Sequence, residues 1–411
     1  MNANAAAESF FAICPRGLET LLGEELAAVG ARDVGIEAGG VSFSGTLPIA
    51  YAANLHSRLA SRILWQIAQA PYHDEATLYA AATAVNWHEY FANEQTLRVD
   101  VTASRTPLRS LEFATLKIKD AIVDRLRTDT GGRPSIDRAQ PDVRVFAYLD
   151  ATTVTLYLDL SGEPLFKRGW RRDKGEAPLK ENLAAGLLRL ANWSPERPLF
   201  DPMCGSGTIA IEAALLAIAR APGLDRSFGF ERLRSFDEAA WRSVRARALA
   251  AQRPETVCCI VGTDISTRVI EQARRNAGLA GLAALLADGR LQFAARDVRL
   301  SEPPVPASTG ADANARGQII SNPPYGEQSS PKSASVPNLM RDFADRMKLL
   351  FAGWEAWLLS ADRDLPRQMR LQETRKTVLF NGPLECRFFR FELVAGKYRA
   401  RSGTHETKPA D

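Results

Sequence analysis

The order of hydrophobic and polar positions divides this chain into two halves with different patterns. Before about residue 165, short strand-like runs are mixed with segments whose apolar residues recur at helical spacing. Strands that pair with one another, with helices set apart from them, are typical of an α+β unit. The predicted strands of this half are 10–15, 41–45, 97–102, 143–149 and 153–160, and the predicted helices are 16–29, 49–65 and 111–126.

From Leu183 onward, near-continuous apolar strands alternate with amphipathic helices, which predicts a mostly parallel α/β sheet with helices on its faces. The last two strands are separated by a short turn, so we expect them to form an antiparallel pair at the edge of that sheet. The predicted strands are 198–200, 257–265, 291–298, 317–324, 354–361, 376–380 and 386–394, and the predicted helices are 181–193, 208–220, 267–279 and 338–351.

Length and composition fit this division and exclude several classes of protein. A chain of 411 residues is long enough for two or three domains. Its apolar runs all fall short of about 18 residues, so we expect no membrane span, and its amino-terminus lacks the basic and apolar regions of a signal peptide. Five scattered cysteines without a CxxC pair, and four histidines of which three precede residue 90, predict a cytoplasmic protein with reduced thiols and no metal.

A glycine-rich turn, DPMCGSGT at 201–208, follows one predicted strand and opens the next helix. Gly205 and Gly207 let a ligand approach the backbone where side chains would clash, at the strand ends where open parallel sheets bind ligands. The turn fits a dinucleotide fingerprint, but the acidic residue that ends the next strand, Asp264, lies much further along the chain than the roughly 20 positions of that fingerprint. A tight turn without a ligand is the structural alternative.

Two further carboxylates end the neighbouring predicted strands. Asp264 stands where a carboxylate suits the hydroxyls of a ribose. Asp297 stands where one could accept a hydrogen bond from an adenine amino group. The sequence leaves an alternative open for each of them: Asp264 as the N-cap of the following helix, and Asp297 as an ordinary turn residue.

The residues Asn322-Pro323-Pro324-Tyr325 follow the next strand. Two prolines make a stiff turn without N–H donors, which would hold the Asn322 side chain and the Pro323 carbonyl in place to accept hydrogen bonds from an exocyclic amine. Accepting both hydrogens turns the nitrogen lone pair toward an electrophile, so no histidine base is needed. Tyr325 offers a ring on which an extruded base can stack. A purely structural Pro-Pro turn is the alternative.

A basic stretch with two aromatic residues, FKRGWRRDKGEAPLK at 166–180, joins the two halves. Such a stretch could follow a phosphate backbone, although a solvated linker has the same composition. The net charge of +4 does not decide between the two interpretations. The residues predicted to bind RNA phosphates are Lys167, Arg168, Arg171, Arg172 and Lys174.

Taken together, these motifs resemble those of the class I S-adenosylmethionine-dependent amino-methyltransferases. DPMCGSGT, the TD at 263–264, the RD at 296–297 and SNPPYGE carry that likeness. CPRGLETLLGEEL, LDLSGEPLFKRGWR and APLKENLAA extend it over about residues 8–395, and there the chain is similar to the THUMP-domain large-subunit rRNA guanine-N2 methyltransferases. N-P-P-Y alone is shared with N6-adenine-specific DNA methylases.

This resemblance implies a Rossmann-like class I methyltransferase domain with a mostly parallel, seven-stranded sheet, preceded by an α+β ferredoxin-like and THUMP RNA-binding region. The implied cofactor is S-adenosyl-L-methionine, and the implied partner is RNA, as 23S rRNA or a large-subunit assembly precursor. Neither a membrane nor a metal is expected as a partner. The expected divisions are a ferredoxin-like unit at 1–50, a THUMP domain at 51–165, a basic linker at 166–182, the methyltransferase domain at 183–400 and a flexible tail at 401–411.

Residue by residue, the resemblance places the methionine part of the cofactor on the turn from Asp201 to Thr208, its ribose on Asp264 and its adenine on Asp297. Lys180, Glu181 and Asn182 match a segment that closes over the cofactor. Cys204 is interpreted as packing against the cofactor, not as a nucleophile. The implied catalytic residues are Asn322, Pro323, Pro324 and Tyr325, and the implied cofactor-binding residues are Lys180, Glu181, Asn182, Asp201, Cys204, Gly205, Gly207, Thr208, Asp264, Ile265, Asp297, Val298 and Asn322.

The leading hypothesis is N2-methylation of a guanine in 23S rRNA. The alternatives are a THUMP-type tRNA guanine-N2 methyltransferase, a DNA adenine-N6 methyltransferase and a non-catalytic RNA-binding factor. The α+β first half argues against the DNA enzyme, and the complete glycine turn and N-P-P-Y argue against the factor. The fused member of the family carries a second methyltransferase that makes 7-methylguanine. We expect that activity to be absent from this chain unless another chain supplies it.

Overall fold

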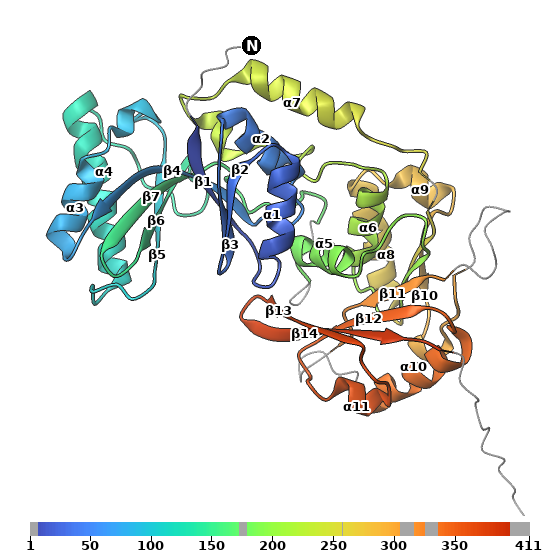
Figure 1. Ribbon diagram of the computed structural model, residues 1–411. Coiled ribbons are helices and arrows are strands. Elements are labelled where there is room, and N and C mark those ends of the chain that lie inside the picture. Colours follow the sequence, from blue (N-terminus) through green and yellow to red (C-terminus); the bar gives the residue numbers. More distant parts are fainter. Residues whose placement is uncertain (1–6, 172–178, 257, 305–315, 325–335, 395–411) are drawn as a thin grey trace, which may run out of the picture.

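The computed structural model describes residues 7–171, 179–256, 258–304, 316–324 and 336–394, which fold into two seven-stranded sheets (Figure 1). Arg172, Lys174 and Tyr325, three of the predicted site residues, lie outside these ranges. Within them, no helix is long and apolar enough to cross a membrane. The same ranges contain no group of three or more His, Cys, Asp or Glu that could hold a metal ion.

The amino-terminal half forms one mixed sheet. Its elements are β1 (Glu8–Ile13), α1 (Glu19–Ala28), β2 (Arg32–Glu37), β3 (Gly40–Gly45), α2 (Leu47–His56), β4 (Arg62–Pro71), α3 (Glu75–Thr83), η1 (Trp87–Glu89), β5 (Leu97–Ala103), α4 (Leu111–Thr130), β6 (Val143–Leu149) and β7 (Thr153–Asp159). The strand order is β2-β3-β1-β4-β7-β6-β5. The helices α3 and α4 pack side by side, and α4 contacts β5, the edge strand of the sheet (Figure 1). The domain boundary expected after residue 50 falls inside α2, and one sheet spans both sides of it.

The predicted helix 49–65 is wrong in its second half. α2 ends at His56, and the chain enters β4 at Arg62. β4 pairs with β1 on one side and with β7 on the other. This central position satisfies its backbone hydrogen bonds and outweighs the local helical pattern. The pattern also misses β2, a largely exposed strand, and α3, which begins at a capping box formed by Asp74 and Thr77.

The carboxyl-terminal half forms the second sheet. Its elements are α5 (Glu181–Leu190), β8 (Leu199–Asp201), α6 (Thr208–Ala217), η2 (Gly229–Arg232), α7 (Glu238–Ala250), β9 (Ile260–Asp264), α8 (Thr267–Leu279), α9 (Ala283–Ala287), β10 (Leu291–Ala295), η3 (Val298–Leu300), β11 (Gln318–Ser321), α10 (Val336–Leu350), β12 (Glu355–Ser360), α11 (Leu365–Met369), β13 (Arg375–Asn381) and β14 (Leu384–Glu392). The strand order is β10-β9-β8-β11-β12-β14-β13. The strands from β10 to β12 run parallel, and β14 pairs antiparallel with both β12 and β13. The predicted mostly parallel sheet with an antiparallel pair at its edge is confirmed.

Hydrophobic clusters fill both faces of the second sheet. Successive residues of β11, Ile319 and Ile320, belong to different clusters, because side chains alternate between the faces of a strand. One cluster surrounds α10 and contains Phe343. The other runs from the amino-terminal sheet through α5 and α6 to β11. The two halves of the chain therefore share a core and pack directly against each other.

Candidate functional site

The carboxyl ends of three parallel strands bring the predicted motifs together. β8 ends at Asp201, β9 at Asp264 and β11 at Ser321. The register pairs Asp201 with Gly262 and Asp264 with Ala295. The strand order reverses between β8 and β11, and a switch point of this kind opens a crevice beyond the strand ends.

The glycine turn between β8 and α6 has a backbone that requires glycine. Gly205 and Gly207 have φ angles of +53° and +85°, a region that side chains make unfavourable. A Cβ on Gly207 would meet Ala273 and the Phe293 ring at 3.0 Å, whereas a Cβ on Gly205 would meet nothing within 4 Å. Gly207 therefore permits close packing beneath the turn, and Gly205 leaves the other side of it open to a ligand.

The Asp264 carboxylate binds the glycine turn to the end of β9. Its Oδ2 accepts a hydrogen bond from the Gly205 N–H at 3.2 Å, and its Oδ1 accepts one from the Ser266 N–H at 3.0 Å. The N-cap of α8 is Ser266, so the alternative interpretation of Asp264 as that cap is wrong. Each carboxylate oxygen can accept more than one hydrogen bond. Asp264 therefore keeps acceptor capacity for the hydroxyl groups of a ligand.

Two buried titratable groups lie beneath the turn. Burial raises the pKa of Asp201 to about 7, and the Asp264 charge acts in the same direction. The Ser321 hydroxyl donates to Asp201 Oδ1 at 2.7 Å, which ties the end of β8 to the end of β11. Burial also raises the pKa of the Cys204 thiol. A protonated thiol is a poor nucleophile, which agrees with the interpretation of Cys204 as a packing residue.

Asn322 follows β11 directly, beside the Asp201–Ser321 hydrogen bond. Its Oδ1 is shielded from solvent and has no hydrogen-bond partner among the described atoms. Leaving a buried polar atom without a partner costs about 1–3 kcal/mol. Pro323 is buried and Pro324 half-buried next to it. The Asn322 amide oxygen is therefore placed to accept a hydrogen bond from a donor that is not part of this region of the protein.

Arg171, which the sequence predicts to bind RNA phosphates, forms hydrogen bonds to the glycine turn and to the start of α5 instead. Its guanidinium donates to Glu181 Oε1 at 2.9 Å, to Thr208 Oγ1 at 2.7 Å and to Ser206 Oγ at 3.2 Å. Burial raises the pKa of Glu181, and the charge of Arg171 opposes that shift. Glu181 and Thr208 thus lie at the turn, and their contact with a cofactor stays a prediction. Arg171 is a residue of the site that the strand-end motifs do not reveal.

The prediction that Arg168 binds RNA is also corrected, because this residue is 4% exposed and lies between the two halves. Its Nε donates to Glu212 Oε1 at 3.3 Å, and its other N–H groups donate to the backbone oxygens of Leu165 and Arg58. The buried Arg58 forms an ion pair with Glu212 at 3.6 Å. We call Arg58, Arg168 and Glu212 the buried triad. It joins the first half, the linker and α6.

The side chain of Lys167 is more than half exposed and forms an ion pair with Glu163. Its predicted contact with RNA stays a prediction. Arg172 and Lys174 cannot be placed, because they lie outside the described residues.

Asp297 lies two residues after the end of β10 and binds Arg299. Its Oδ1 accepts a hydrogen bond from the Arg299 N–H at 2.9 Å, and both carboxylate oxygens accept from the Arg299 guanidinium. These hydrogen bonds lower the pKa of Asp297. This is the turn role that the sequence leaves open, so a ligand must share the carboxylate with Arg299. Val298 is buried in the cluster around α10, and Ile265 is 73% exposed beside Asp264.

The Asn182 side chain binds the amino-terminal half, which corrects its expected place over a cofactor. Its Nδ2 donates to the Leu59 carbonyl at 3.2 Å and to Ser61 Oγ at 3.1 Å. The Lys180 ammonium lies 4.9 Å from the centroid of the Phe166 ring. The first residues of α5 therefore point to two different places: Glu181 to the glycine turn, and Asn182 to the contact between the halves.

Three regions of the chain match known families. Residues 168–390 match the family described as RMKL-like, methyltransferase domain. Residues 9–64 match the RlmL ferredoxin-like domain, and residues 72–159 match the THUMP domain.

Two curated proteins of the genus Aeromonas are similar to almost the whole chain. The ribosomal RNA large subunit methyltransferase K/L of Aeromonas hydrophila is 39% identical over 393 residues, which cover 94% of this chain and 54% of that protein. The protein of the same name from Aeromonas salmonicida is 39% identical over 398 residues, with the same coverage of 94% and 54%. The chain thus spans about half the length of the curated relatives it matches.

Solved structures share the architecture. SMU.472, described as a methyltransferase and crystallised with SAH, has a TM-score of 0.82 and 29% identity, over 95% of this chain and 99% of that chain. A predicted N6-adenine-specific DNA methylase from Listeria monocytogenes has a TM-score of 0.81 and 29% identity, over 94% and 96% of the two chains. TrmN from Thermus thermophilus shares the fold, with a TM-score of 0.65 and 21% identity over 95% and 100% of the two chains.

Proposed function

Because this chain belongs to the RMKL-like methyltransferase family, we propose that it methylates the N2 amine of a guanine in 23S rRNA. Its fold is that of S-adenosylmethionine-dependent methyltransferases, and a structure of the same architecture contains SAH, the demethylated form of that donor. The donor supplies an electrophilic methyl group on a sulfonium sulfur. The chain's own residues then have to bind the donor, present the amine and hold the RNA.

The crevice beyond β8 and β9 fits this donor. The open backbone at Gly205 can lie against its methionine part, and the remaining acceptor capacity of Asp264 suits the ribose hydroxyls. Asp297 is the proposed partner of the adenine amino group, with its carboxylate oriented by Arg299. Arg171 holds the shape of the turn by binding Thr208 and Glu181 at once.

One observation supports an amine as the methyl acceptor: the shielded Asn322 Oδ1, which has no partner among the described atoms. The lone pair of an exocyclic amine is delocalised into the base, so the nitrogen is a poor nucleophile. When Asn322 Oδ1 and the Pro323 carbonyl accept its two hydrogens, the nitrogen becomes pyramidal and its lone pair turns toward the methyl group. After transfer the nitrogen is positively charged and acidic, so it loses its proton without a strong base.

The choice of RNA rests on the amino-terminal half. Residues 72–159 match the THUMP domain, and the Aeromonas relatives are named for large-subunit ribosomal RNA. The sequence also resembles the guanine-N2 enzymes along nearly its full length, which favours guanine over the adenine of the DNA methylases. Lys167, Arg172 and Lys174 are proposed as contacts with RNA phosphates.

The test is transfer of a labelled methyl group from S-adenosylmethionine to unmodified 23S rRNA, tRNA and duplex DNA. We expect label in the rRNA alone, recovered as N2-methylguanine after nuclease digestion and mass spectrometry. Label in tRNA alone would favour the tRNA alternative, and N6-methyladenine in the DNA would refute the proposal. An Asn322→Ala protein prepared in parallel is the control, because contaminating methyltransferases would label RNA equally in both preparations.

A further inference from the structure

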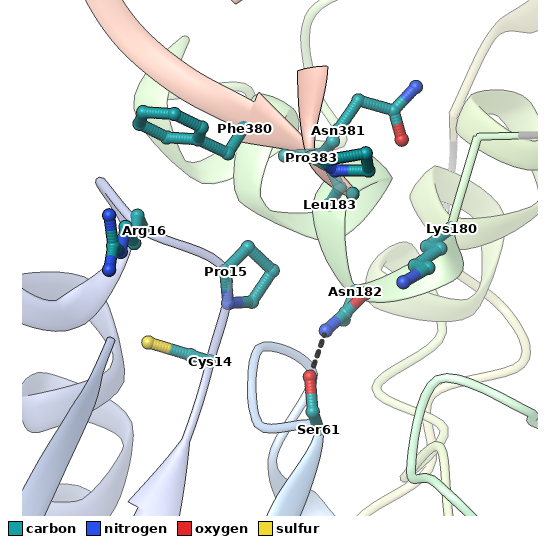
Figure 2. Close-up of a pocket in the computed structure, with 11 residues that line it drawn as sticks. Cys14, Pro15, Arg16, Ser61, Lys180, Asn182, Leu183, Phe380, Asn381 and Pro383 are labelled. Carbon is teal, nitrogen blue, oxygen red and sulfur yellow. Dashed lines mark hydrogen bonds between the residues drawn. The ribbon is translucent and has the colours of Figure 1, made fainter. Parts of the chain in front are cut away.

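A cavity of about 410 Å³ lies between the amino-terminal half and the second sheet (Figure 2). Ligand pockets of small molecules have volumes of about 300–1,000 Å³, so the cavity can hold a ligand the size of one nucleotide. The residues around it come from three places: Cys14, Pro15, Arg16 and Ser61 in the first half, Lys180, Asn182 and Leu183 at the start of α5, and residues 380–383 in the turn from β13 to β14.

This cavity lies at the same edge of the second sheet as the proposed methyl-transfer site. β13 and β12 are both antiparallel to β14, so β13 runs in the direction of the parallel strands and its last residue, Asn381, lies at their carboxyl edge. The start of α5 separates the two places. Glu181 points to the glycine turn through Arg171, whereas Asn182 lines the cavity.

The amide oxygen of Asn182, beside the cavity, is a buried hydrogen-bond acceptor without a partner among the described atoms. The residue is 0% exposed, and its Nδ2 donates hydrogen bonds to the Leu59 carbonyl and to Ser61 Oγ. Its Oδ1 is buried without a hydrogen-bond partner among the described atoms. Buried amide oxygens are nearly always paired, so this atom is suited to an N–H donor that enters from the cavity.

The charge around the cavity favours an anion. Arg16 and Lys180 stand on opposite sides of it, and the first-turn N–H groups of α5 add positive partial charge between them (Figure 2). Burial, together with the charges of the nearby Glu19 and Glu25, raises the pKa of the Cys14 thiol to about 12, so that group carries no negative charge. The described lining residues include no Asp or Glu. The Arg16 guanidinium lies 5.9 Å from the centroid of the Phe380 ring, which lines the same cavity.

We propose that this cavity binds one nucleotide of the RNA substrate, next to the nucleotide whose guanine is methylated. The phosphate lies between Arg16 and Lys180, a base N–H donates to Asn182 Oδ1, and the base packs against Phe380. This inference rests on the proposed function and extends it. The ferredoxin-like region then helps directly to position the target, because it forms one wall of the pocket.

The test compares RNA binding by wild type, Arg16→Glu and the control Arg375→Glu. Arg375 is exposed at the opposite end of β13 from the cavity. The dissociation constant for unmodified 23S rRNA is measured by filter binding over a series of salt concentrations. We expect about a tenfold or larger increase for Arg16→Glu, with its salt slope reduced by about one phosphate contact. The affinity for S-adenosylmethionine, measured by calorimetry, should remain that of wild type.

If Arg16→Glu binds RNA with the affinity and salt slope of Arg375→Glu, the cavity does not contact RNA and the proposal is overturned. Guanosine and adenosine 5′-monophosphates are titrated in parallel as probes. Micromolar binding of either one that Arg16→Glu abolishes, with RNA affinity unchanged, would assign the cavity to a free nucleotide and also overturn it. Because filter binding does not depend on turnover, a failure of methyl transfer to rRNA would refute the proposed function separately.

Discussion

Neutralising Glu212 in the buried triad tests how the two halves of the chain are held together. Glu212 is fully buried on α6, with Arg168 Nε at 3.3 Å and the Arg58 guanidinium at 3.6 Å. Glu212→Gln keeps the shape of the side chain but removes the carboxylate that both buried guanidiniums contact. Burial already lowers the pKa of Arg58, and Glu212 is the main group that opposes this shift.

The expected loss follows from the contacts that remain. Removing one partner of a buried ion pair costs about 3–5 kcal/mol. In the variant, Arg168 still donates to the Leu165 carbonyl, and Arg58 still donates to the carbonyls of Leu215 and Arg220. These bonds satisfy part of each guanidinium, so we expect the lower end of that range, about 3 kcal/mol of unfolding free energy.

The assay is urea denaturation of wild type, Glu212→Gln and a matched control, Glu238→Gln. Glu238 forms an ion pair with Arg242 at 3.8 Å on α7, and their side chains are 71% and 72% exposed. Exposed pairs contribute little, so the control should lose less than about 1 kcal/mol. If Glu212→Gln unfolds at the same urea concentration as the control with the same slope, the triad does not stabilise the contact between the halves and the reasoning is refuted.

Three further predictions concern the strand ends. Asp264→Ala should weaken S-adenosylmethionine binding by about 1.5–3 kcal/mol, the contribution of a charge-assisted hydrogen bond; unchanged affinity in calorimetry would reject the ribose placement. Asn322→Ala should lower the single-turnover rate about 10²–10³-fold with donor affinity unchanged, and a wild-type rate would show that another group positions the amine. Burial raises the pKa of Asp201 to about 7, whereas a carboxyl group of the unfolded chain has a pKa of about 3.9. The folded state therefore binds the Asp201 proton more tightly than the unfolded state does. The stability that this proton provides is lost as the pH rises from the lower value to the higher one. Asp201→Asn should therefore lose less unfolding free energy than wild type between about pH 4 and pH 7 in urea titrations, and parallel pH profiles would contradict the raised pKa.

The parts of the structure that the sequence predicts well have local causes. The central strands of the second sheet, β8, β11 and β12, are buried on both faces. Helices with one apolar face separate the strands along the chain, so strand, helix and sheet type can all be inferred from neighbouring residues. The same sheet type places strand ends at one edge, which is why the sequence alone groups Asp201, Asp264 and Asn322. The helix expected over 49–65 fails because β4 is stabilised by partners on both sides, and no local pattern contains that information.

Some residues have a role in the structure that differs from the role the sequence predicts. In each case the difference comes from a contact with a residue far away in the sequence. Arg168 lies in a basic run that suits solvent or phosphate, but Glu212, 44 positions later, draws it into the core. Arg171 binds Thr208, 37 positions away. Asn182 donates to Leu59, 123 positions away. A run of basic residues predicts exposed side chains only when none of them pairs with a buried carboxylate. A single sequence does not show which carboxylate forms such a pair.

These three contacts have a common effect on the proposed reaction. Arg168 fixes the linker to Arg58 in the first half, and Arg171, three residues later, fixes the same linker to the glycine turn. Asn182 then joins the start of α5 to Leu59. Under the proposed function, RNA held by the first half is therefore set at a fixed distance from Asn322 by packed side chains and not by a free linker. Such a rigid connection is what selecting one guanine requires, because small errors in the position of reacting groups reduce rates severely.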